Sequence, residues 1–155
     1  MYSILSIGID NEILDMLSHS LSHYATCTIV TADDPDSGLS THTEKRYDAI
    51  ISYFSASGHK SLSLLKDLRS SGDITPFILV SGDIPDTNAA ELLNFAADYY
   101  PLKDTGEDTL RGLAYVAVRA IRDSRLCEVV NRSMDEMNRI IYNLPDVPLQ
   151  LILRG

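Results

Sequence analysis

Residues 76–82, Pro-Phe-Ile-Leu-Val-Ser-Gly, decide the fold class of this chain. An apolar run that stops at a Ser-Gly turn is typical of a short strand buried on both faces of a parallel sheet. Residues 47–53, Tyr-Asp-Ala-Ile-Ile-Ser-Tyr, have the same character. Between them, residues 62–68 carry four leucines on one face of a predicted helix, which ends at the Ser-Ser-Gly of residues 70–72. The order strand, helix, strand predicts two parallel strands joined by a helical crossover.

The remainder of the chain continues this alternation. We expect further strands at residues 3–7, 26–31 and 98–102, and further helices from about residue 11, from residue 33, from 86 to 95 and from 106 to 142. The helix that starts at residue 33 is expected to be short or frayed, because Gly38, Thr41 and Thr43 are poor helix formers. Five strands alternating with five helices predict an α/β protein with a doubly wound parallel sheet.

Length and composition limit the function classes. A chain of 155 residues is long enough to bury a sizeable core. Its net charge of −9 disfavours nucleic acid and anionic membrane surfaces as partners, and no apolar run approaches the roughly 20 residues of a membrane span. The cysteines and histidines show no metal-binding spacing; they are Cys27, Cys127, His19, His23, His42 and His59. We therefore expect a soluble domain of the cytoplasm with no signal peptide and no zinc site.

The position of the functional site follows from the fold class. In open parallel sheets the site lies in the crevice at the carboxyl ends of the strands. The loops that leave the predicted strands at this edge cover residues 8–11, 53–58, 81–85 and 102–106. Candidate site residues are therefore expected from four segments that lie far apart in the sequence.

Four segments at or near these strand ends resemble response-regulator receiver domains, the CheY-like modules of two-component systems. They are residues 47–52, 64–72 (Leu-Leu-Lys-Asp-Leu-Arg-Ser-Ser-Gly), 76–82 and 97–103 (Ala-Asp-Tyr-Tyr-Pro-Leu-Lys). The similarity extends from residue 1 to about residue 122, and it is closest in character to the receivers at the front of archaeal sensor proteins with PAS or histidine-kinase modules. The resemblance implies a flavodoxin-like fold with strand order 2-1-3-4-5 and a role in phosphorelay signalling.

In the family that this chain resembles, a phosphoryl group passes from a partner histidine to an aspartate that ends the third strand. That aspartate and an acidic pair after the first strand hold Mg²⁺, which offsets the repulsion between the carboxylates and the incoming phosphoryl group. A hydroxyl that ends the fourth strand and a lysine that ends the fifth contact the phosphoryl oxygens. An aromatic residue just before the lysine reports the change to the outer surface. Ser81, Lys103 and Tyr100 match these last three positions.

The acidic half of this set is missing. The acceptor position is Tyr53, whose phenol cannot form the acyl phosphate of the family, and the positions of the acidic pair are Gly8 and Ile9. A register shifted by one residue would make Asp10 part of the pair, but it would also move a carboxylate into the inward helix position of Leu14. We therefore expect a pseudo-receiver with no catalytic activity, metal or cofactor, in which Ile9 and Tyr53 fill the former metal cavity.

Two other functions stay open. Asp10, alone or with Asp83, is a substitute carboxylate that would make the chain a working phosphoacceptor receiver. A cavity between Gly8, Tyr53 and Ser81 would instead indicate a small-ligand module of flavodoxin-like fold.

Two positions beside the site also depart from the family pattern. The acceptor carboxylate that usually pairs with the lysine is absent here. The Lys103 ammonium group is therefore expected to bond the Tyr53 hydroxyl, Asp10 or Asp83, or to extend into solvent. Asp104 follows it, where many members of the family have a cis-proline.

Residues 110–144 continue the helical pattern beyond the receiver-like part. Their second half carries apolar residues alternately four and three positions apart, namely Val130, Met134, Met137, Ile141 and Leu144. This spacing is that of a coiled-coil seam. We expect a parallel homodimer through this helix, or a connector that transmits strain to a following module. The alternative is a helix that folds back on its own domain.

The end of the chain completes the domain assignment. Residues 140–146, Ile-Ile-Tyr-Asn-Leu-Pro-Asp, resemble the entry into a PAS sensor domain, with residues 149–153 as its first strand. We therefore expect a receiver-like domain at 1–122, a helical connector at 123–144 and a tail at 145–155 that starts a truncated PAS domain. The expected partner is a protein, or a downstream sensor or kinase module, that contacts the surface around Tyr100, the fourth helix and the fifth strand.

Overall fold

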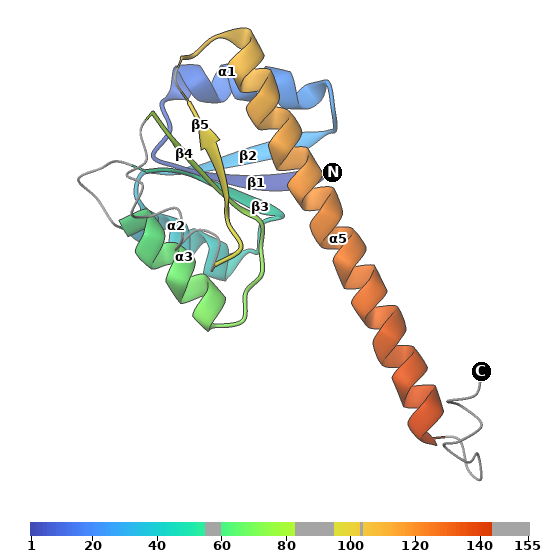
Figure 1. The fold of residues 1–155 in the computed structure, drawn as a ribbon. Helices are drawn as coiled ribbons and strands as arrows, with labels where there is room; N and C mark the ends of the chain where they lie inside the picture. The colour runs from blue at the N-terminus through green and yellow to red at the C-terminus, as the bar shows by residue number, and fades with distance from the viewer. Residues whose placement is uncertain (55–59, 83–94, 103, 144–155) are drawn as a thin grey trace. The chain divides into compact units, whose positions relative to one another are not determined.

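The computed structural model describes residues 1–54, 60–82, 95–102 and 104–143, and it divides the chain into two units, Met1–Arg122 and Asp123–Gly155. The first unit contains a five-stranded parallel sheet with the order β2-β1-β3-β4-β5 (Figure 1). The strands are β1 (Tyr2–Ile7), β2 (Cys27–Ala32), β3 (Ala49–Tyr53), β4 (Phe77–Ser81) and β5 (Asp98–Pro101). The expected doubly wound order is confirmed.

Both faces of the sheet are buried, because alternate residues of a strand point to opposite sides. In β3, Ile51 packs into the core on one face and Ile50 into the core on the other. In β4, Ile78 and Leu79 divide in the same way, and every residue of that strand is buried. A strand with no exposed face must be apolar at nearly every position, which explains the uninterrupted apolar runs of the sequence.

Helices α1 and α5 cover one face of the sheet, and α2 and α3 cover the other (Figure 1). Their bounds are Asn11–Ser22 for α1, Pro35–Glu44 for α2, Lys60–Ser70 for α3 and Glu107–Asn143 for α5. Leu17 of α1 and Leu113 of α5 belong to one core, whereas Leu65 of α3 belongs to the other. The helix expected at residues 86–95 lies outside the described residues, apart from Phe95, which is in a turn.

The second helix is short, as expected, because α2 has ten residues, fewer than each of the other helices whose bounds the structure describes, and side-chain hydrogen bonds support it. The Asp34 side chain caps the helix by accepting a hydrogen bond from the Ser37 backbone N–H at 2.8 Å, and Pro35 occupies the first turn. The hydroxyls of Thr41 and Thr43 donate to backbone carbonyls four residues earlier, at 2.8 Å each. The side chains that weaken the intrinsic helix preference are therefore occupied within the helix itself.

Gly38 gives a second reason for the composition of α2. A Cβ atom at this position would collide with the side chain of Ile7 in β1, since the two would be only 2.5 Å apart. Glycine lets the helix approach the sheet closely enough to bury Ile7, which is only 1% exposed. The residue that lowers helix propensity here is the one that permits the helix to pack.

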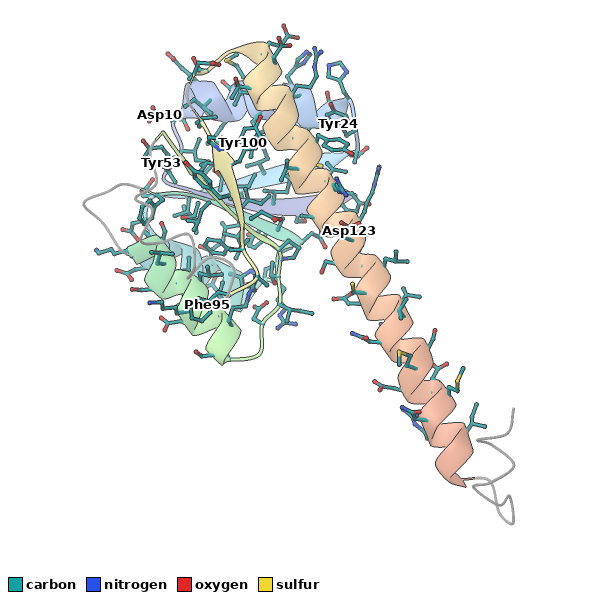
Figure 2. The ribbon with its side chains drawn as sticks, viewed as in Figure 1. Asp10, Tyr24, Tyr53, Phe95, Tyr100 and Asp123 are labelled. Carbon is teal, nitrogen blue, oxygen red and sulfur yellow. The ribbon has the colours of Figure 1, made fainter. Side chains whose placement is uncertain are left out.

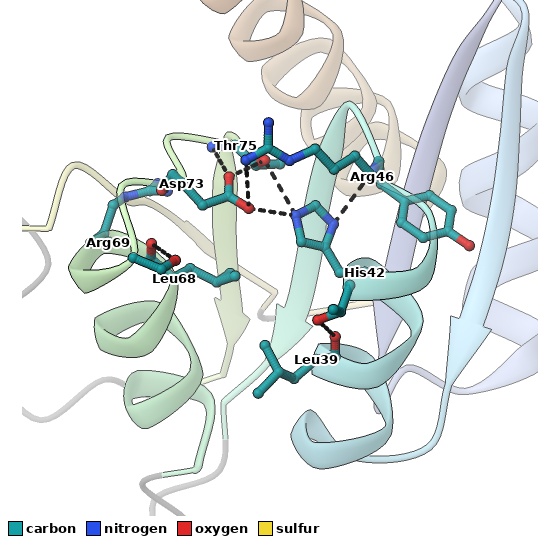
Figure 3. Close-up of polar contacts among 10 residues, drawn as sticks. Leu39, His42, Arg46, Leu68, Arg69, Asp73 and Thr75 are labelled. Carbon is teal, nitrogen blue, oxygen red and sulfur yellow. Dashed lines mark hydrogen bonds and ion pairs between the residues drawn. The ribbon is translucent and has the colours of Figure 1, made fainter.

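A buried polar cluster joins α2 to the start of β4 (Figure 3). The His42 ring is 3% exposed, and its Nδ1 atom accepts a hydrogen bond from the Tyr47 backbone N–H at 3.3 Å. Its Nε2 atom therefore carries the proton and donates to Asp73 Oδ2 at 2.8 Å. Asp73 also accepts hydrogen bonds from the backbone N–H and the hydroxyl of Thr75. These contacts satisfy a buried histidine and a buried carboxylate at the edge of the sheet opposite to the predicted site.

The environment of Asp73 favours its charged form. Burial raises the pKa of this carboxyl, but the hydrogen bonds from Thr75 and His42 outweigh burial and hold the pKa below its ordinary value. The ionised carboxylate thus stabilises the fold at neutral pH, and this contribution is lost as the pH falls through the lowered pKa.

The second unit is described by residues 123–143 of α5. Several of its large apolar side chains are more than 45% exposed, namely Leu126, Val129, Val130, Met134, Met137 and Ile140. The side chain of Ile141 and all of Leu144 lie outside the described residues, as does the tail at 145–155. Within the part of the chain that the structure describes, no helix is both long and apolar enough to span a membrane.

The cluster around Asp73 generates a stability prediction. Asp73→Asn removes the charge-assisted hydrogen bonds, so it is expected to lower the free energy of unfolding by about 1–3 kcal/mol at pH 7. Asp67→Asn, at an exposed position of α3, is the control and should change it by less than about 0.5 kcal/mol. Urea titrations at pH 7 and near pH 3 measure both, and the difference between wild type and Asp73→Asn should shrink in acid. Equal stability of the two at pH 7 would contradict the assignment.

Candidate functional site

The structure brings the predicted strand-end residues together at one edge of the sheet. Ile7 of β1 lies beside Ser52 of β3, and Tyr53 lies beside Val80 of β4. The residues that follow or end these neighbouring strands are therefore adjacent in space. Gly8, Tyr53 and Ser81 meet here as expected, whereas Lys103 and Asp83 lie outside the described residues.

Gly8 closes β1 in a conformation that suits glycine. Its φ angle is +69°, and its backbone N–H donates to the Ala32 carbonyl of β2 at 3.0 Å. A Cβ atom here would lie 3.8 Å from the Cβ of Tyr53, so the two positions are direct neighbours. An aspartate at residue 8 would be strained by this backbone conformation, which agrees with the absence of a carboxylate.

Tyr53 does not fill a cavity, which corrects the expectation from the sequence. Its side chain is 44% exposed, whereas the next residue, Phe54, is 2% exposed and packs among the side chains of α3 and β4. Ser52, on its other side, is buried and shares a 2.9 Å hydrogen bond with Ser61 of α3. The side chains of Ser52 and Phe54 thus contact α3, which covers that face of the sheet, whereas the phenol of Tyr53 is exposed at the end of the strand.

Ile9 and Asp10 occupy the loop between β1 and α1. Ile9 is half-buried and packs against the core that α1 and α5 cover. Asp10 is the N-cap residue of α1, but its exposed side chain makes no capping hydrogen bond. Figure 2 shows Asp10 and Tyr53 at the same end of the sheet. One position of the acidic pair is therefore apolar and packed, and the Asp10 side chain that follows it in the sequence is exposed.

The metal-binding capacity of this edge is accordingly small. Among the described residues, no group of three His, Cys, Asp or Glu side chains is placed to hold a metal ion. Mg²⁺ needs near-octahedral oxygen coordination and is held in proteins by carboxylates together with phosphate oxygens. Since the described residues of this edge form no such cluster, they do not offer the ligand set of a Mg²⁺ site.

Ser81 ends β4 in a buried position, 3% exposed. Its carbonyl accepts hydrogen bonds from the Leu102 backbone N–H at 2.9 Å and from the Tyr99 hydroxyl at 3.2 Å. These bonds fasten the end of β5 to β4. The serine at the family's hydroxyl position is thus anchored through its backbone.

Tyr100 connects β5 to α5. Its hydroxyl donates to the Thr109 carbonyl at 2.7 Å, and it occupies the space that a side chain at Gly112 would need. Burial, together with the nearby charge of Asp104, raises the pKa of the Tyr100 phenol. The ring therefore lies against the first turns of α5, and glycine at residue 112 is required for that position.

The contacts of Thr109 and Gly112 in this region were not predicted from the sequence, and Asp104 was noted only as a departure from the family pattern. Asp104 Oδ1 accepts hydrogen bonds from the Gly106 backbone N–H at 2.8 Å and from the Thr109 hydroxyl at 2.7 Å, which together lower the pKa of the carboxyl. These contacts organise the start of α5. The spacing Asp-Thr-Gly-Glu-Asp-Thr at 104–109 carried this signal, since acidic and hydroxyl residues gather at helix starts.

The contact of Tyr100 with α5 generates a second prediction. Tyr100→Phe keeps the ring and removes the hydrogen bond to Thr109, so it should lower the free energy of unfolding by about 0.5–1.5 kcal/mol. Tyr115→Phe is the matched control, because the Tyr115 side chain is 50% exposed, and its effect should stay within about 0.5 kcal/mol. Chemical denaturation measures both, and equal effects would argue against the Tyr100 contact.

No protein-family model matches this chain, and no curated protein matches it either. Solved structures do match it. Chemotaxis protein CheY4 of Vibrio cholerae has a TM-score of 0.61 and 21% identity over 76% of this chain and 98% of its own. The receiver domain of the Francisella response regulator 1452 has a TM-score of 0.60 and 22% identity, with 77% and 98% covered. A response-regulator receiver domain protein of Clostridium thermocellum has a TM-score of 0.65 and 19% identity, with 82% and 99% covered. These similarities show that the chain has the flavodoxin-like fold of receiver domains.

Proposed function

We propose that this chain is a receiver-like signalling module of a two-component system that cannot be phosphorylated at the usual position. It acts by contact with a protein partner and by dimerisation through its C-terminal helix, and it is not an enzyme. The proposed compartment is the cytoplasm, in keeping with the free thiols of Cys27 and Cys127.

One observation carries the loss of phosphotransfer. The last residue of β3 is Tyr53, and its neighbour at the end of β1 is Gly8, so neither strand end presents a carboxylate. A tyrosine hydroxyl has no carboxyl group with which to form an acyl phosphate. The described residues also lack a cluster that fits Mg²⁺, the ion that would balance the developing charge of a phosphoryl transfer.

Protein contact is supported by the part of the receiver machinery that is kept. Tyr100 lies against α5 through Thr109 and Gly112, so it couples the strand end of β5 to that helix. We place the partner surface around Tyr100 and β5. A downstream sensor or kinase module is the expected occupant of this surface.

Dimerisation is supported by the second unit. Val130, Met134 and Met137 are each between 47% and 61% exposed in the single chain. A row of exposed apolar side chains at coiled-coil spacing is stabilised by burial against another helix.

The first test is phosphorylation. Incubation with acetyl phosphate and Mg²⁺ is expected to leave the intact mass of the protein unchanged, because the last residue of β3 is a tyrosine, which cannot form an acyl phosphate. A gain of one phosphate that is sensitive to hydroxylamine would contradict the proposal. Asp10→Asn then identifies the acceptor, since loss of that adduct in the variant would assign the reaction to Asp10.

The second test is molar mass in solution. The full chain is expected to show a dimer that dissociates on dilution, whereas a version that ends at Arg125 should be a monomer at every concentration. Light scattering across a concentration series measures both. Monomers for both chains would remove dimerisation from the proposed function.

A further inference from the structure

The helical part of the second unit contains a seven-residue repeat. Residues 125–131 are Arg-Leu-Cys-Glu-Val-Val-Asn, and residues 132–138 are Arg-Ser-Met-Asp-Glu-Met-Asn. Each repeat begins with arginine and ends with asparagine, and Arg139 starts the next. A hydrophobic pattern with a period of seven in a helix is kept facing one partner by a left-handed supercoil. The repeat therefore includes the arginine, acidic and asparagine positions as well as two apolar positions.

The repeat defines four layers. Cys127 and Met134 share one position of the repeat, and Val130 and Met137 share the other. The four residues alternate three and four apart along α5, so they form a single row, which we call the seam. All four are exposed in the single chain, Val130 at 47%, Met134 at 57% and Met137 at 61%.

The charged residues of the repeat avoid the flanks of the seam. The positions that border it are uncharged, namely Leu126, Asn131, Ser133, Asn138 and Ile140. The charged side chains occupy the remaining positions, where Glu128 stands four residues before Arg132 and Asp135 four residues before Arg139. An acid four residues before a base stabilises a helix from its outer face. The charges are thus arranged to support the helix while the seam and its borders remain neutral.

The neutral borders indicate which partner the seam accepts. In coiled coils, charged residues at the bordering positions select a different helix of complementary charge. A second copy of this chain, which carries a net charge of −9, would be repelled by acidic borders and has none to meet here. A second copy also supplies the same four layers at the same spacing. The occupant that fits is therefore the same segment of another molecule.

We propose that residues 125–140 of two copies pair in parallel and in register, with Cys127, Val130, Met134 and Met137 each facing their own counterparts. This inference rests on the proposed dimerisation and adds its partner surface, orientation and register. Parallel pairing follows from the connector role, because it brings the like ends of the two helices together. When the two helices are in register, all four seam residues of each copy are buried against the partner. A shift by one repeat would leave Cys127 and Val130 of one copy without a facing seam residue.

The two adjacent valines provide a matched pair of substitutions. Val130 lies in the seam, and Val129 lies outside it, although both are exposed, at 47% and 57%. Val130→Glu places two like charges in one layer and should raise the dimer dissociation constant at least ten-fold. Val129→Glu adds the same charge one residue away and should change it less than three-fold. Light scattering of the full-length chains across a dilution series measures both.

Cross-linking of Cys127 tests orientation and register. Helix axes about 8–10 Å apart, with Cα atoms about 2.3 Å from each axis, place directly facing seam Cα atoms about 3.4–5.4 Å apart, and the upper part of this range suits a disulfide. Disulfides need about 4.4–6.8 Å. In antiparallel pairing centred on Met134, the two Cys127 residues would be about 21 Å apart along the axis. In-register parallel pairing is therefore the arrangement in which these thiols can join.

The protein for this experiment is the full chain with Cys27→Ser, so that Cys127 is its single thiol. Diamide accepts two electrons and two protons from the thiol pair and becomes a hydrazine, while the S–S bond forms. The control carries Cys127→Ser and Arg132→Cys, which moves the thiol to the outer face of the same helix. Cys127 should form a covalent dimer at least ten times faster than the control on non-reducing gels.

The outcomes separate this inference from the function on which it rests. A full chain that is monomeric throughout would overturn both. A dimer that survives Val130→Glu, or that Val129→Glu disrupts equally, would overturn the seam while leaving dimerisation in place. A dimer in which Cys127 joins no faster than the outer-face control would overturn the parallel register.

Discussion

The sheet of this protein must be covered on both faces, and this constraint determines most of the first unit. A strand buried on two sides has almost no position for a polar side chain, so chemistry is confined to the strand ends. Ser52 shows the cost of the exception, since its hydroxyl is buried and is satisfied by Ser61 of the covering helix. Gly8 and Tyr53, on which the proposed loss of phosphotransfer depends, therefore lie at the strand ends, where this constraint no longer applies.

The fold was predictable because short apolar runs, which are typical of buried strands, alternate along the sequence with segments of helical periodicity. The strands at residues 76–80 and 47–53 are recognisable from composition alone, and their parallel order follows from the helices between them. Helix α2 forms despite its weak propensity for a physical reason. Propensity counts Gly38 as a weakness, whereas the packed structure uses it for close contact with Ile7, and such contact is invisible in a single sequence.

The site was predictable in its position and only partly in its geometry. Sequence spacing places Tyr53 beside Gly8, but it does not determine whether the phenol turns inward, and the ring proved to be exposed. The pair of His42 and Asp73 was missed because its members are 31 residues apart, and only the folded chain brings them to 2.8 Å. Asp104 was noted as a departure from the family pattern, yet its contacts with Gly106 and Thr109 depend on loop geometry.

The contact between Gly38 and Ile7 has a consequence for the cooperativity of the fold. The segment Pro35–Glu44 has little helical preference of its own, since glycine, serine and threonine make up half of it. Its helical form depends on the sheet beneath it. We therefore expect the segment to lose its helical structure when it separates from β1. It then unfolds in the same cooperative unit as the strand that it covers, and does not move as a preformed helix.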